Sequence, residues 1–283
     1  AAGSNLRILA DNIWDYSRDD IPEAWRLIGE DPRDDVRAPQ FAQLVRAFMP
    51  DVLDLQEYSL HMHQRFYPLI RRYGYRIAYE GEEPWNNTPI FYNPETVELV
   101  DVNYVLYAPS CWSNIGSKSY TSAVFRKKDT GRLFAVVNTH LWWKSEAAQP
   151  GSTYARAAQV RLMMAEAEVL KNKYGCTIFV TGDMNAYEDS LPIRQFIEGG
   201  YTPCYKAATD ATDNGNGHHI CGPKDGYSRT SRRRSPDREK GAIDHCFIYN
   251  AQEGVAVKVF DCITARFTVK LTDHYPYLID AAL

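Results

Sequence analysis

Six short segments of the sequence place carboxylate, amide or imidazole side chains next to an apolar run. The segments are Ala10-Asp11-Asn12, Leu55-Gln56-Glu57, Asn138-Thr139-His140, Gly182-Asp183-Met184-Asn185, Ile243-Asp244-His245 and Thr272-Asp273-His274. We interpret each as the end of a strand, where the fold holds a side chain rigidly but leaves it open to a cleft. Mg²⁺ and Mn²⁺ prefer oxygen ligands and bind few carboxylates, with water and substrate phosphate completing the shell. These residue types therefore predict phosphoryl chemistry assisted by a divalent metal ion.

The ordered set of six resembles the endonuclease/exonuclease/phosphatase superfamily, which includes DNase I-like nucleases, AP endonucleases and inositol polyphosphate 5-phosphatases. The matching residues run from Asn12 to Pro276, which is essentially the whole chain. The resemblance implies a single domain over residues 5–283 with an α+β fold, a four-layered α/β sandwich in which helices flank two packed mixed β-sheets. It also implies Mg²⁺ (or Mn²⁺) as the cofactor. The substrate would be a phosphoester, either nucleic acid or a small phosphorylated molecule.

The resemblance assigns the metal ligands as well. It makes Glu57 the principal metal-binding carboxylate, and it lets Asn12 reach the metal-bound water or the phosphate. Asp273 becomes a second carboxylate of the metal shell. Taken alone, Glu57 would be read as a solvated polar residue and Asn12 as a turn cap. Their place in the ordered set favours the functional interpretation.

The reacting groups follow from the same resemblance. Asp183 would orient or deprotonate the attacking water, and Asn185 would hold a phosphate oxygen. Strand alternation places these two side chains on one face, although an Asx turn that closes the strand is the alternative. His140 and His274 would face the phosphate as imidazolium ions that stabilise growing charge. Asp244 would fix the tautomer of His274.

Three further features bear on the substrate. Trp142 and Trp143 follow the His140 segment, and Trp142 would be a stacking wall for a base or sugar, or would pack beneath a helix. Arg156 begins the next helix and would support substrate binding. Six basic residues lie between Gly226 and Lys240. They would either grip substrate phosphates or form a solvated loop.

The elements that must position these residues can be read from periodicity. Short apolar runs rich in Val, Ile, Phe and Tyr predict strands at Leu6–Ala10, Val52–Gln56, Ile90–Tyr92, Ala123–Arg126, Leu133–Asn138, Thr177–Thr181, Ala242–Tyr249 and Val255–Phe260. Amphipathic spacing predicts helices at Pro39–Phe48, Thr153–Lys173 and Leu191–Glu198. Alternation also turns Asp11 and His245 away from the site.

Composition excludes several classes of protein. With a net charge of −4, the protein has no overall positive field that would attract nucleic acid or anionic membranes. No apolar run reaches 18 residues, so we expect no membrane span. We also expect a monomer. The start at Ala1 predicts a mature terminus of a periplasmic or extracellular protein, although a trimmed cytoplasmic chain would begin in the same way. Cys204 and Cys221 flank a polar loop and could form a disulfide if the protein is exported, and the sequence leaves their disulfide state open.

Two other function classes compete with a metal-dependent hydrolase. One is a catalytically idle module of the same fold that binds phosphate or nucleic acid, because a fold alone does not prove activity. The intact set of site residues argues against it. The other is a zinc hydrolase, which needs more His and Cys ligands than these segments supply.

Overall fold

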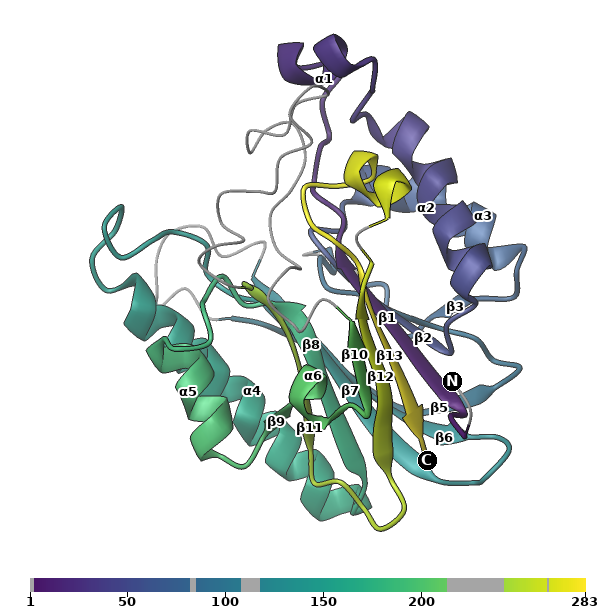
Figure 1. Cartoon of the computed structure of the whole chain (residues 1–283), viewed down its shortest axis with the longest axis vertical. Coiled ribbons are helices and arrows are strands. Elements are labelled where there is room, and N and C mark those ends of the chain that lie inside the picture. The colour runs from purple at the N-terminus through teal and green to yellow at the C-terminus, as the bar shows by residue number, and fades with distance from the viewer. Residues whose placement is uncertain (1–2, 82–84, 108–117, 213–241, 264) are drawn as a thin grey trace.

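Two mixed β-sheets pack face to face and carry helices on their outer faces (Figure 1). The computed structural model describes residues 3–81, 85–107, 118–212, 242–263 and 265–283. The predicted four-layered α/β sandwich is therefore confirmed. Among the described helices, none combines the length and the apolar character that crossing a membrane requires.

The first sheet has seven strands in the order β10-β12-β13-β1-β2-β4-β3. Their bounds are Leu6–Asn12 (β1), Val52–Gln56 (β2), Arg76–Ile77 (β3), Ile90–Tyr92 (β4), Asp210–Thr212 (β10), Ala256–Cys262 (β12) and Tyr277–Ala282 (β13). Strand β1 runs parallel to β2 and antiparallel to β13. The first and last strands of the chain therefore lie side by side in the middle of this sheet.

The second sheet has six strands in the order β5-β6-β7-β8-β11-β9. Their bounds are Val97–Leu106 (β5), Ser119–Lys127 (β6), Leu133–His140 (β7), Thr177–Asp183 (β8), Thr202–Pro203 (β9) and Asp244–Tyr249 (β11). Strands β7 and β8 are parallel, because the long helix α4 (Ser152–Tyr174) connects them. Strand β11 returns antiparallel to β8.

The helices bury their apolar sides on the two outer sheet faces. Helices α2 (Asp34–Phe48) and α3 (Leu60–Arg71) cover the first sheet, while α4 and α5 (Leu191–Glu198) cover the second (Figure 1). Three shorter helical segments complete the described fold, α1 (Glu23–Ile28), α6 (Cys204–Ala207) and a 3₁₀ turn (Arg266–Lys270). Ala10 contributes to the core between the sheets, whereas Leu9 and Ile13 pack under the helices. Asp11 therefore faces away from Asn12, as alternation predicts.

The predicted elements are present, with one shifted helix start and several unpredicted elements. Helix α2 begins at Asp34 and not at Pro39, so Pro39 lies inside the helix. The prediction that Pro39 occupies the first turn was wrong because acidic Asp34 and Asp35 form that turn instead. Helix α3 and strands β5 and β13 were not predicted. In β5 most side chains are only partly buried, so its apolar alternation is weak.

The six segments with functional side chains gather at one end of the sandwich, but not all of them are strand ends. Asn12, His140 and Asp183 are the last residues of β1, β7 and β8, and Glu57 directly follows β2. Asp244 instead begins β11, and the Asp273 segment precedes β13. Because β11 and β13 run antiparallel to their neighbours, their beginnings meet the ends of the others.

Polar side chains link the two sheets directly beneath this end. Gln56 donates from Nε2 to Oδ1 of Asn138 at 2.8 Å, and the Asn138 amide donates to the carbonyl of Leu55 at 2.8 Å. Thr181 donates to Asp54 at 2.7 Å. All four polar side chains are buried. These bonds fix the separation of the sheets and hence the relative positions of the functional side chains that follow them in sequence.

Gly182 occupies a position that tolerates no side chain. A Cβ atom there would lie 2.1 Å from the carbonyl oxygen of Thr139 on the neighbouring strand β7. We expect Gly182→Ala to lower the free energy of unfolding by about 3 kcal/mol, because the backbone atom it meets cannot move aside. Urea denaturation measures this effect. Gly131→Ala, which has a left-handed φ but open space, should cost only about 1 kcal/mol, and equal losses for both would contradict the steric argument.

Cys204 is a buried free thiol in the core between the sheets. Its Sγ lies 2.9 Å from Sγ of Cys246, across the pairing of β9 with β11. The disulfide considered for Cys204 has its second partner, Cys221, outside the described residues. Cys204 itself faces Cys246.

Candidate active site

Strands β1 and β2 bring Asn12 and Glu57 together. The Asn12 amide nitrogen donates to Glu57 Oε1 at 3.0 Å and to Asp183 Oδ2 at 2.8 Å. The backbone N–H of Trp14 meets Asn12 Oδ1 at 2.9 Å, and because an N–H can only donate, this contact fixes which end of the amide faces the carboxylates. Asn12 therefore holds the carboxylates of Glu57 and Asp183 in place through its amide nitrogen.

Glu57 sits in a strained backbone conformation with φ 53°. A non-glycine residue in the left-handed region persists only where the surrounding structure fixes it, and such residues concentrate at functional sites. The side chain is 29% exposed and opens onto the cavity described below. Its Oε2 accepts a hydrogen bond from the backbone N–H of Asp15 at 3.0 Å. Asn185, across the site, has a similar φ of 47°.

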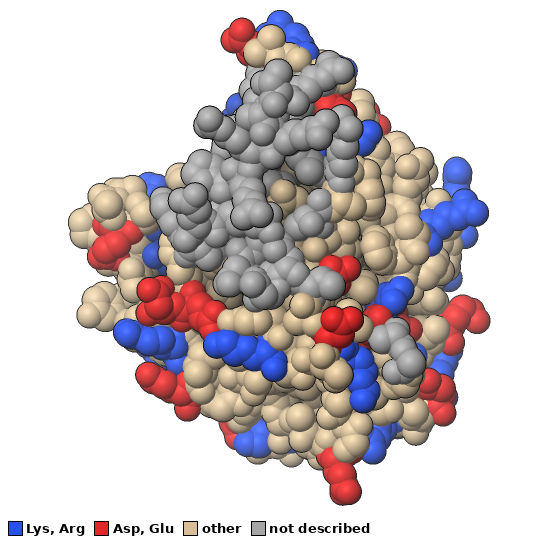
Figure 2. Space-filling view, viewed as in Figure 1, with Lys and Arg blue, Asp and Glu red and all other residues tan. Residues whose placement is uncertain are grey.

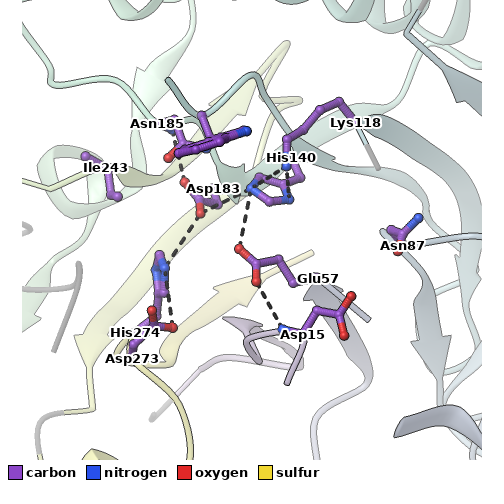
Figure 3. A pocket seen from close by; sticks show the side chains of 11 residues that line it. Asp15, Glu57, Asn87, Lys118, His140, Asp183, Asn185, Ile243, Asp273 and His274 are labelled. Carbon is purple, nitrogen blue, oxygen red and sulfur yellow. Dashed lines mark hydrogen bonds and ion pairs between the residues drawn. The ribbon is translucent and has the colours of Figure 1, made fainter. Parts of the chain in front are cut away.

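Strands β7 and β8 bring His140 and Asp183 into register (Figure 3). His140 Nε2 lies 3.5 Å from Asp183 Oδ2 and 3.9 Å from Glu57 Oε1. Asp183 Oδ1 accepts the backbone N–H of Asn185 at 3.0 Å, and the Asn185 amide donates to the carbonyl of Leu141 at 3.0 Å. The Asx turn and the functional placement of Asp183 are thus compatible, because each uses a different carboxylate oxygen.

Asp244 and His274 form a buried pair on the other side of Asp183. His274 Nδ1 and Asp244 Oδ2 are 2.7 Å apart, and His274 Nε2 lies 3.7 Å from Asp183 Oδ2. The Asp244–His274 bond fixes the ring orientation, as the resemblance implied. His245 faces away and contacts the carbonyl of Ala186 at 2.6 Å. This contact agrees with the structural role that alternation predicts for His245.

An open cavity of about 390 Å³ lies over these groups. Eight of its lining residues belong to the segments recognised in the sequence or to the region before β4, namely Glu57, Asn87, His140, Asp183, Asn185, Ile243, Asp273 and His274. The other lining residues are Asp15, Lys118 and Trp143. Acidic, cationic and aromatic groups therefore meet around one space that is open to solvent (Figure 3).

The two histidines have opposite protonation tendencies. Burial and the neighbouring Lys118 ammonium lower the pKa of His140 to about 4, so its ring is neutral at neutral pH. Burial also opposes the charged form of His274, but Asp244, Asp273 and Asp183 outweigh burial and raise the pKa of His274 well above its ordinary value. The site thus contains one imidazolium and one neutral imidazole, whereas the sequence led us to expect two imidazolium ions.

The donor set fits a divalent metal ion. Glu57, His140 and Asp183 each offer a ligand atom, and these atoms lie within 4.8 Å of one another. Burial disfavours the charged form of Glu57, but His140, Lys118 and the Asn12 amide outweigh it and lower the pKa of Glu57 to about 2. Two carboxylates held this close repel each other until a cation lies between them. A second group consists of Asp183, Asp244 and His274. In this second group, Asp244 and His274 are already hydrogen-bonded to each other.

Three predicted residues lie at the edge of this arrangement or beneath it. Asp273 lines the cavity 3.9 Å from His274 Nε2. It is absent from the two described groups of candidate metal ligands. Arg156 donates to the carbonyls of Trp142 at 3.2 Å and Lys144 at 2.6 Å, so it braces the chain after β7 and is not among the described lining residues. Trp142 is 4% exposed and donates from its indole to Ser152 at 3.1 Å.

Three lining residues, Asp15, Lys118 and Trp143, were not assigned to the site from the sequence. Of the two adjacent tryptophans, Trp142 packs beneath α4 while Trp143 is 56% exposed and lines the cavity. Of the two interpretations of Trp142, the structure shows the packed one. Lys118 precedes β6 and carries no motif, although the pairing of Ser119 with His140 places it at the site. The basic segment between Gly226 and Lys240 lies outside the described residues.

Comparison with known proteins identifies the family and the fold. Residues 25–274 match the model of the Endonuclease/Exonuclease/phosphatase family. No curated protein matches the chain. A mannosyl-6-phosphatase from Bacteroides thetaiotaomicron has a similar structure, with 18% identity, a TM-score of 0.74, and coverage of 98% of this chain and 100% of that one.

Two further structures share the fold. The human Nocturnin catalytic domain with bound sulfate has 18% identity and a TM-score of 0.67, with 98% of this chain and 93% of that one covered. TDP2 from D. rerio, complexed with a single-strand DNA product, has 15% identity and a TM-score of 0.68, with 98% and 99% covered. At these identities the likeness shows the fold, whereas the match to the family model spans most of the sequence. The chain belongs to the Endonuclease/Exonuclease/phosphatase family, for which phosphoester hydrolysis is the general chemistry.

Proposed function

We propose that this protein is a Mg²⁺- or Mn²⁺-dependent phosphoester hydrolase that works by in-line attack of water on phosphorus. The observation that carries the proposal is the position of Asp183. Its carboxylate lies within 3.7 Å of two imidazole nitrogens and shares the Asn12 amide with Glu57. A carboxylate placed in this way can take a proton from water while neighbouring groups stabilise a phosphate.

Each side chain then has a defined task. Glu57 and Asp183 would hold the divalent ion, which supplies polarisation of the phosphoryl oxygen and stabilisation of the leaving alkoxide. Asp183 orients the attacking water and accepts its proton. The His274 imidazolium donates to a non-bridging phosphate oxygen, and Asp244 keeps that imidazolium charged and aligned. Asn185, whose amide is anchored on Leu141, positions the phosphate from the opposite side.

The neutral ring of His140 suits a different role from that of His274. A neutral imidazole can offer a lone pair to a cation or accept a proton, but it adds no positive charge. We propose that His140 binds beside the metal ion, between Glu57 and Asp183 on one side and Lys118 on the other. The two histidines are therefore not interchangeable.

A panel of substrates tests this function and selects the subclass. The panel contains plasmid DNA, short RNA, poly(A), bis-p-nitrophenyl phosphate, inositol phosphates, mannose 6-phosphate and sphingomyelin. Each is incubated with Mg²⁺, with Mn²⁺ and with EDTA. We expect turnover of at least one substrate that requires metal. Polymer cleavage would identify a nuclease or phosphodiesterase, and release of inorganic phosphate would identify a phosphatase. If no substrate of the panel is hydrolysed, the alternative of a catalytically idle binding module would be favoured.

A further inference from the structure

The ammonium group of Lys118 lies in the wall of the cavity (Figure 3). Lys118 is 7% exposed, and its Nζ lies 3.3 Å from each ring nitrogen of His140. Its position is fixed by strand pairing, because Ser119, the first residue of β6, pairs with His140 at the end of β7. The charge of Lys118 therefore lies in the wall of the cavity, beside His140.

Lys118 differs from the buried cations Lys127 and Arg37 in having no carboxylate partner among the described residues. Lys127, at the far end of the same strand, lies 3.4 Å from Asp51, and Arg37 lies 2.9 Å from Asp34. No carboxylate of the described residues lies within 4.0 Å of Lys118 Nζ. Burial lowers the pKa of Lys118, while Glu57 and Asp183 oppose that effect from a greater distance. Burying a charge without a close partner costs free energy unless a bound ligand supplies the opposite charge.

The nearest carboxylates are already engaged. Glu57 accepts hydrogen bonds from Asn12 and from the backbone of Asp15, and Asp183 accepts from Asn12 and Asn185. Both also belong to the group of candidate metal ligands. Once a cation binds there, their field at Lys118 is largely neutralised. The missing negative charge must then come from the cavity.

Among the described residues on the face shown in Figure 2, basic and acidic side chains are interspersed. At the cavity, in contrast, Lys118 and the His274 imidazolium lie on either side of Asp183. An ammonium offers three N–H donors and His140 can engage only one of them, so two remain for a ligand. Phosphate oxygens are strong acceptors for such donors.

We propose that Lys118 binds a non-bridging oxygen of the substrate's phosphate group and is a specificity-determining residue of this site. The proposal rests on the proposed function for the identity of the substrate, but phosphate binding can be measured without turnover. In the complex, the phosphate supplies the counter-ion that the protein lacks.

Calorimetric titration with inorganic phosphate tests the proposal on the metal-loaded full chain. We expect Lys118→Gln to weaken phosphate binding by about ten- to a hundredfold, the usual effect of losing a charge-assisted hydrogen bond. Lys118→Arg should keep most of the affinity. With a hydrolysable substrate, KM should rise by a similar factor and kcat should fall less, because the charge binds ground state and transition state alike.

Lys144→Gln is the matched control, because Lys144 contacts the rings of both tryptophans near the cavity without lining it. It should leave phosphate affinity unchanged. Unaltered phosphate binding by a folded Lys118→Gln variant would overturn the proposal, as would a wild-type protein that binds no phosphate. Phosphate binding that depends on Lys118 in a protein without turnover would instead overturn only the proposed function. Thermal melts of every variant separate loss of binding from loss of fold.

Discussion

The double variant Glu57→Gln/Asp183→Asn should lose at least about 10⁴-fold in turnover while remaining folded. Both substitutions are nearly isosteric, so the Asn12 amide keeps acceptors in place of the two oxygens it now bonds at 3.0 and 2.8 Å. The variant removes two negative charges that face each other. Because the folded protein lowers the pKa of Glu57 to about 2, the Glu57 carboxylate stabilises the fold above pH 4.5, and the metal-free variant should have a lower free energy of unfolding at neutral pH.

Steady-state kinetics with the best substrate of the panel and thermal melts measure both effects. The control is Asp189→Asn/Glu198→Gln, which removes the same charge from two exposed positions outside the cavity. That control should keep full activity. A folded Glu57→Gln/Asp183→Asn protein that retains a tenth of wild-type turnover would show that the chemistry occurs elsewhere. The two losses should not add, because both residues act on one bound ion.

Asp54→Asn should stabilise the protein at alkaline pH by on the order of 3 kcal/mol. Asp54 lies on β2 in the core between the sheets, fully buried, and accepts a hydrogen bond from Thr181 at 2.7 Å. Burial raises the pKa of Asp54 from 3.8 to about 7. Because the folded-state pKa is higher than the unfolded one, the contribution of Asp54 to stability is fully present below pH 4. It is lost as the pH rises through 7.

Asparagine keeps an acceptor for Thr181 but cannot ionise. The free energy of unfolding from urea titrations, compared at pH 4.5 and pH 8, measures the difference. We expect the variant to match the wild type closely at the lower pH and to exceed it at the higher pH. Equal stability of the two proteins at pH 8 would contradict an ionisable, buried Asp54. Thr181→Val offers a check, because it removes the only described side-chain donor to this carboxylate and should raise the pKa of Asp54 further.

The sequence predicted the layers and the principal carboxylates because both depend on local signals. Buried strands such as β8 are continuous apolar runs, and their polar ends mark where a sheet meets a cleft. Strand β5 was not predicted because partial burial on both faces weakens its alternation. Helix α3 was not predicted, although Ser59 caps its first turn and its buried residues Met62, Phe66 and Ile70 recur every four positions.

The details of the site depend on tertiary contacts that no local pattern encodes. Adjacent residues Trp142 and Trp143 are equivalent in sequence, and only the packing of α4 decides which of them reaches the cavity. Lys118 becomes part of the site through the pairing of β6 with β7, which joins residues 22 positions apart. The orientation of the Asn12 side-chain amide, with its nitrogen toward the carboxylates, depends on one hydrogen bond from the backbone N–H of Trp14.

The most direct test of the central claim is the dependence of turnover on Mn²⁺ concentration in the wild type and in Glu57→Gln. A metal-dependent hydrolase that uses this cavity should show saturable activation, no turnover in EDTA, and a shift of the activation curve to roughly 100-fold higher metal in the variant. Turnover that persists in EDTA, or identical activation curves for the two proteins, would contradict a metal ion held by Glu57.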